Sequence, residues 1–139
     1  MKLKQYITKS LLVSFVGAFS FSVYAQSVNI SLSGAQEVPP VMTAATSSGT
    51  IGVAIDGAVS GAISTFGIDA TMAHIHEGAS GQNGPVIVHL IKTAENVWSV
   101  PQGAKLSVAQ MQSFKDGNLY VNVHSAVNKA GEIRAQLKP

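Results

Sequence analysis

The stretch TMAHIHEGASGQNGPVIVHLI, residues 71–91, shows the pattern on which the chain is organised. Residues 71–76 and 86–91 are rich in β-branched and aliphatic side chains and predict two strands, whereas residues 78–85 are rich in glycine and predict a loop. This strand–loop–strand unit carries three of the four histidines in the sequence. The fourth, His124, lies in another predicted strand near the C-terminus.

Outside this unit, runs of Val, Ile, Thr and Ser recur between turn residues at short intervals, which is typical of many short strands. The dipeptide Asp56-Gly57 separates two such runs and predicts a hairpin. About seven or eight short strands predict an all-β fold, an antiparallel Greek-key sandwich or barrel of the superoxide-dismutase or immunoglobulin kind. The other strands are expected at residues 28–33, 49–55, 58–68, 96–100, 118–124 and 132–137.

One short helix is expected among the strands, over residues 107–115 with the sequence SVAQMQSFK. Ser107 precedes the apolar residues and is a good N-cap. The spacing of Val108, Met111 and Phe114 predicts that these three side chains face the core.

The N-terminus has the three regions of a secretory signal peptide. A lysine-containing start is followed by the apolar stretch 11–23 and by small residues up to Ala25, where we expect cleavage. The apolar stretch is shorter than the ~20 residues of a membrane-spanning helix, so we expect no membrane span after cleavage. The sequence thus predicts a signal peptide at 1–25 and one secreted or periplasmic domain at 26–139.

Charge and cysteine content narrow the classes of function. Three of the nine Lys and Arg residues lie in the signal peptide, which leaves six basic against seven acidic residues, a net charge of −1. No basic patch is present, so nucleic acid is excluded as a partner. The chain has no cysteine, so the domain depends on its apolar core, on a bound metal, or on both. A soft metal would have to be bound by imidazole, thioether or carboxylate groups.

The strand positions of the histidines place them on polar faces. His74 and His76 share one face of their strand, at a Cα spacing of about 6.6 Å. His89 points away from its aliphatic neighbours Val88 and Leu90, and His124 shares the polar face of its strand with Tyr120 and Asn122.

Four imidazoles on such faces are suited to bind one metal ion through His74, His76, His89 and His124. Four nitrogens without a thiolate favour copper, with zinc second. A single histidine on a strand is more often a surface or core residue, so a structural role for all four is the alternative.

Three segments carry a family resemblance: LSGAQEVPPV, HIHEGASGQNGPVIVHL and GNLYVNVHSAVNKAGEIRAQL. They closely resemble the CHRD (chordin) domain family, and the resemblance covers residues 28–137. In animals such domains occur in chordin, a secreted antagonist of bone morphogenetic proteins, and stand-alone bacterial members are secreted. The resemblance therefore implies an extracellular protein–protein interaction module as the alternative to metal binding.

A second resemblance concerns the order of the histidines. A strand-borne His-x-His, a glycine-rich loop ending in Gly-Pro, one histidine and a later strand histidine are similar to the copper ligands of copper/zinc superoxide dismutases, which are Greek-key barrels. This resemblance implies His74, His76, His89 and His124 as copper ligands, with His89 at the bridging position. It also implies Arg134 as the residue that guides an anionic substrate.

The sequence departs from the dismutases in three respects: it lacks the disulfide pair, the further zinc histidines and a clear counterpart of the electrostatic loop. We therefore expect copper binding without turnover, and keep a copper-only dismutase-like redox enzyme as an alternative. The exposed edges of a sandwich also allow a homodimer. Glu37, in the GAQEVPP segment, is expected either to accept a hydrogen bond from a ligand imidazole or to cap loop amides.

Overall fold

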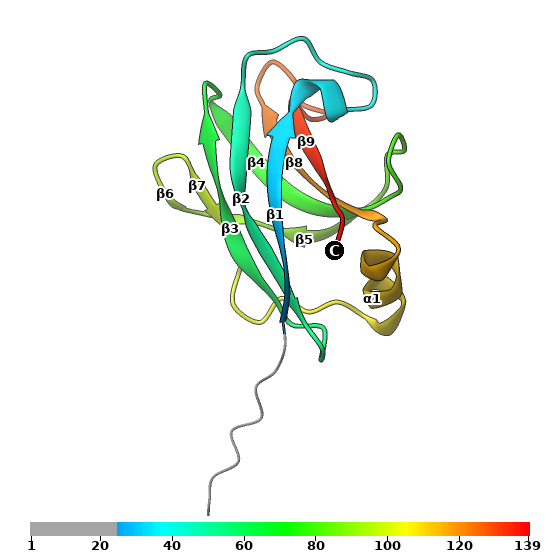
Figure 1. Cartoon of the computed structure of the whole chain (residues 1–139). Helices are drawn as coiled ribbons and strands as arrows, with labels where there is room; N and C mark the ends of the chain where they lie inside the picture. Colours follow the sequence, from blue (N-terminus) through cyan, green and yellow to red (C-terminus); the bar gives the residue numbers. More distant parts are fainter. Residues whose placement is uncertain (1–24) are drawn as a thin grey trace, which may run out of the picture.

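The computed structural model describes residues 25–139, so the expected signal peptide lies outside the described residues except for Ala25. Within this range the chain forms nine strands, one α-helix and one short 3₁₀ helix (Figure 1). The strands are β1 (Ala25–Ser33), β2 (Thr46–Ala54), β3 (Val59–Phe66), β4 (Ala70–Glu77), β5 (Val86–His89), β6 (Ile91–Ala94), β7 (Val97–Ser99), β8 (Leu119–Ser125) and β9 (Ile133–Leu137); the helices are η1 (Gly34–Gln36) and α1 (Val108–Lys115).

All strands belong to one sheet, in the order β5-β4-β8-β9-β1-β2-β3-β7-β6, and all pairings are antiparallel. The two outermost strands, β5 and β6, are consecutive in the chain and are separated only by Leu90. The sheet therefore curls into a nearly closed barrel (Figure 1). The expected all-β antiparallel fold with one short helix is confirmed.

The strand expected over residues 86–91 differs from prediction because it divides at Leu90. The first part pairs with β4 and the second with β7. A strand that changes pairing partner turns a corner, which joins the two ends of the sheet. The apolar run alone contains no signal for this bend.

The interior of the barrel is aliphatic, and β4, β8 and β9 contribute alternate residues to it. In β4 these residues are Ala73 and Ile75, so the histidines on either side of Ile75 point outward. Most outward side chains of these strands, His74 and His76 in β4 among them, are nevertheless buried, because the loops 34–45 and 78–85 and the β8–β9 connection lie over them. A buried polar layer therefore lies between the outer face of these strands and the loops that cover it.

Helix α1 begins as predicted, with Ser107 as N-cap and a reciprocal capping box formed with Gln110. Phe114 is buried and Met111 packs against the core, but the prediction for Val108 is wrong, since its side chain is 90 % exposed. Residues 108 and 114 lie about 120° apart around a helix, so a helix of only two turns contacts the barrel through its later turn. No helix among residues 25–139 is long and apolar enough to cross a membrane.

Candidate metal centre

The centre is built on three neighbouring strands, with β4 between β5 and β8. His74 lies opposite His89 of β5 and opposite Asn122 of β8, and His124 lies two residues further along β8. Both β4 histidines share the outer face, as predicted, because Ala73 and Ile75 occupy the core. Strand register therefore brings together residues that are far apart in the sequence.

Three histidines converge: one ring nitrogen from each of His74, His76 and His124 lies within 4.8 Å of the others, and all three side chains are buried. His74 Nδ1 and His124 Nε2 are 2.9 Å apart. Two nitrogens bound to one ion at about 2.0–2.1 Å lie roughly 3 Å apart. The pair is therefore already at the spacing of two neighbouring ligands.

Backbone carbonyls orient two of the rings. His76 Nδ1 lies 2.9 Å from the oxygen of Gly84, and His124 Nδ1 lies 2.9 Å from the oxygen of Lys129. Because a carbonyl only accepts, each Nδ1 carries the proton and each Nε2 keeps its lone pair. A metal-binding histidine is normally oriented by such a hydrogen bond from its other nitrogen.

The Nε2 atom of His76 is buried and has no hydrogen-bond partner among the described residues. An unpaired buried acceptor costs about 1–3 kcal/mol, so it needs an explanation. The Nε2 of His124 differs, since it accepts from His74 Nδ1. His76 and His124 thus each offer a lone pair on Nε2, and His74 offers Nδ1, whose proton is exchangeable. These three nitrogens can bind a cation.

The surroundings of His74 and His76 favour the neutral form of these two rings. Burial, followed by the neighbouring His124, His76 and His89, lowers the pKa of His74 from 6.5 to about 4. Burial also lowers the pKa of His76, although the carbonyl of Gly84 acts in the opposite direction. Neutral imidazole is the form that binds metals, so protons compete weakly at neutral pH.

His89 stands apart from the three converging histidines. Its side chain is exposed, and its ring centre lies 4.8 Å from that of His74 in an edge-on arrangement. The group of nitrogens within 4.8 Å does not include it. Its role as a fourth ligand stays a prediction.

A stack of three side chains supports His76. The ring of Tyr120 lies parallel to the His76 ring at 4.7 Å, and the guanidinium carbon of Arg134 lies 3.5 Å from the centre of the Tyr120 ring. The Tyr120 hydroxyl accepts a hydrogen bond from the amide of Gly84, whose carbonyl orients His76. A Cβ on Gly84 would overlap the carbonyl oxygen of Glu77, so only glycine fits at this position.

Arg134 is almost fully buried, with 1 % of its surface exposed. It donates hydrogen bonds to the carbonyl of Ala79 and to Gln136, and a longer one to Asn83. These contacts tie the loop 78–85 to β9. Its expected part in guiding an anionic substrate stays a prediction.

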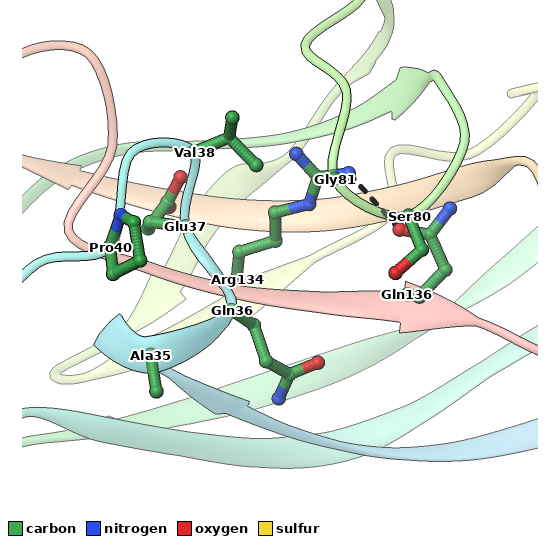
Figure 2. A pocket seen from close by; sticks show the side chains of 9 residues that line it. All are labelled: Ala35, Gln36, Glu37, Val38, Pro40, Ser80, Gly81, Arg134 and Gln136. Atoms are coloured by element: carbon green, nitrogen blue, oxygen red, sulfur yellow. Dashed lines mark hydrogen bonds between the residues drawn. The ribbon is translucent and has the colours of Figure 1, made fainter.

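A pocket of about 450 Å³ opens beside this stack, and Figure 2 shows Glu37 and Arg134 among the side chains that line it. Burial raises the pKa of Glu37 to about 7, against the opposing effects of Arg134, the Val38 amide and Asn122. The Oε1 atom of Glu37 has no hydrogen-bond partner among the described residues. The pocket reaches the histidines only indirectly, through Arg134, which lines it and stacks on Tyr120.

The expected hydrogen bond from an imidazole to Glu37 is not what orients His76 and His124, which use backbone carbonyls instead. Sequence reasoning missed these two acceptors because every residue carries the same carbonyl. Only the loop conformation brings those of Gly84 and Lys129 to the rings.

The family model of the CHRD domain matches residues 28–137, nearly all of the expected mature chain. Comparison with curated proteins and with solved structures finds no match.

Proposed function

The chain belongs to the CHRD domain family, and we propose that it is a secreted or periplasmic protein that binds one metal ion, copper in preference to zinc. The ligands in this proposal are His74, His76 and His124, with His89 as the fourth. The observation that supports it best is the convergence of three buried imidazoles, one of which has a ring nitrogen without a hydrogen-bond partner among residues 25–139.

The proposal assigns one atom of each ring to the ion. His76 and His124 would bind through Nε2, since their Nδ1 protons are held by carbonyls. His74 would bind through Nδ1, which faces His124 Nε2 at 2.9 Å. Binding through Nδ1 therefore requires the proton of His74 to move to Nε2, so that the ring stays neutral.

Copper is favoured by the chemistry of the donor set. All the converging groups are imidazoles, and no carboxylate among residues 25–139 joins the group. Nitrogen sites bind Cu(II) more tightly than other divalent first-row metals. The chain also lacks cysteine, so thiolate ligands, which favour zinc and iron–sulfur clusters, are excluded.

Location outside the cytoplasm is supported by the signal-peptide pattern of residues 1–25. A secreted domain without disulfides would gain stability from an ion that binds only the folded state.

An extracellular interaction module with structural histidines is the second candidate. It is favoured by one observation: His74 is hydrogen-bonded to His124, which is in turn hydrogen-bonded to the carbonyl of Lys129, so three of the four nitrogens of these two rings are paired without an ion. These hydrogen bonds do not account for the Nε2 of His76, which has no partner among the described residues.

Dismutase-type turnover is a third candidate function. It is tested by whether the copper-loaded domain accelerates superoxide decay beyond the metal-free domain with chelator.

The test uses the mature domain, residues 26–139, loaded with one equivalent of Cu(II) and freed of excess metal. We expect about one copper ion per chain and a single axial EPR signal with nitrogen hyperfine structure. The double variant H74A/H76A should retain no copper. Equal copper binding by this variant would refute the proposal.

A matched control is available in two other buried polar residues of the barrel, Ser47 in β2 and Thr65 in β3. The double variant S47A/T65A also removes two buried polar groups but touches no histidine. It should bind copper as the unmodified domain does. Circular dichroism of both variants separates loss of the site from loss of the fold.

A further inference from the structure

Met72 lies on the same outer face of β4 as the two histidines that follow it. Ala73 points into the core, so its neighbours Met72 and His74 point outward. In the pairing of β4 with β8, Met72 lies directly opposite His124. Side chains directly opposite in antiparallel strands have Cβ atoms about 4.5–5.5 Å apart. Met72 therefore flanks both rings of the 2.9 Å nitrogen pair.

The packing of the barrel does not account for Met72. Its side chain is 46 % exposed and does not belong to the apolar core. On the neighbouring strand β8, every residue is buried. A long apolar side chain at the edge of a buried histidine cluster is thus left without a packing role, and it has three rotatable bonds with which to reach a neighbour.

The chemistry of a thioether differs from that of imidazole. Sulfur of methionine is a soft ligand that favours Cu(I), whereas Zn(II) and Cu(II) are well served by nitrogen. It carries no proton at any ordinary pH, so its binding does not depend on acidity.

We propose that the Met72 thioether is a further ligand of the histidine centre and that it gives the site its affinity for Cu(I). This inference rests on the proposed metal function of His74, His76 and His124. It makes the cargo more specific: a copper ion that the site accepts in its reduced state, with two or three imidazoles and one sulfur. Because Met72 is 46 % exposed, its side chain is accessible to an incoming ion.

The test is Met72→Leu, which keeps the size and apolar character of the side chain and removes only the sulfur. Cu(I) affinity is measured without oxygen, by competition with the chromophoric chelator bicinchoninate. We expect the variant to bind Cu(I) at least about tenfold more weakly, the scale on which even indirect partners change metal affinity. Binding of Cu(II) and Zn(II) should change much less. X-ray absorption of the Cu(I) protein should show a copper–sulfur contribution that the variant lacks.

Met42→Leu is the matched control, because Met42 is fully exposed in the loop between η1 and β2. It should leave Cu(I) affinity and the copper–sulfur signal unchanged. Equal Cu(I) affinity in M72L and the unmodified domain, or no copper–sulfur signal in the latter, would overturn the role of Met72 alone. Failure of the unmodified domain to bind copper in either oxidation state would overturn the proposed function and this inference with it.

Discussion

Glu37 is expected to make the metal-free domain less stable as the pH rises. Burial raises the pKa of its carboxyl group to about 7 in the folded chain, from an ordinary value of 4.5. Below about pH 4.5 the group is protonated in both the folded and the unfolded state, so it has no effect. Between the two values only the unfolded state releases the proton, and above about pH 7 the folded state bears the full cost of a buried charge.

The size of this effect follows from the two pKa values. At 1.36 kcal/mol for each pKa unit, the cost approaches about 3 kcal/mol near pH 8. The pKa of about 7 already includes the attraction of Arg134 and Asn122, which oppose the effect of burial. Glu37→Gln removes the charge at constant shape.

The assay is urea unfolding of the metal-free domain and of E37Q between about pH 4 and 8, with a chelator present. His74 titrates in the same range with the opposite sign: its lowered pKa gives stability that is lost as the pH falls from about 6.5 to about 4. The difference between the two proteins cancels that contribution. We expect E37Q to equal the unmodified domain near pH 4 and to exceed it by up to about 3 kcal/mol near pH 8. A difference that is constant with pH, or that favours Glu37 at high pH, would refute the reasoning.

Three further perturbations test the surroundings of the centre. Arg134→Met removes the guanidinium group that stacks on Tyr120 and donates a hydrogen bond to the carbonyl of Ala79. It should lower the free energy of unfolding in urea by about 2–4 kcal/mol, because the carbonyl of Ala79 loses this donor. Gly131→Ala places a Cβ 2.6 Å from Glu37 Oε1 at a φ of +133°, and it should lower stability by about 1–3 kcal/mol, measured in the same way. Bound copper should persist on acidification below the ordinary histidine pKa of 6.5, because the lowered pKa of His74 weakens competition from protons, as equilibrium dialysis at stepped pH would show.

Strand alternation was the part of the structure that the sequence predicted best. The prediction that His74 and His76 share one face of their strand, with Ala73 and Ile75 on the other, is confirmed, and the structure shows that the histidine face is the outer one. The same rule failed to reveal the bend at Leu90, because an apolar run looks alike whether it stays in one sheet or turns a corner.

The contacts that orient the rings could not be predicted, for a different reason. The carbonyls of Gly84 and Lys129 are backbone groups, and their positions depend on how two loops fold over the sheet. The burial of Arg134 depends on the same loops. Residue types and spacing therefore indicated which side chains share a face, whereas the acceptors, the stack on Tyr120 and the separate place of His89 required the three-dimensional arrangement.

The central claim is that particular nitrogen atoms of three histidines bind the ion, and NMR of the imidazoles tests it most directly. Long-range ¹H–¹⁵N correlations of the mature domain would be recorded before and after one equivalent of Cu(I), which is diamagnetic. We predict metal-type shifts for Nε2 of His76 and of His124 and for Nδ1 of His74, with the Nδ1 protons of the first two retained by their carbonyls. Four imidazoles unchanged by one equivalent of Cu(I), and equally unchanged by Zn(II), would contradict the account.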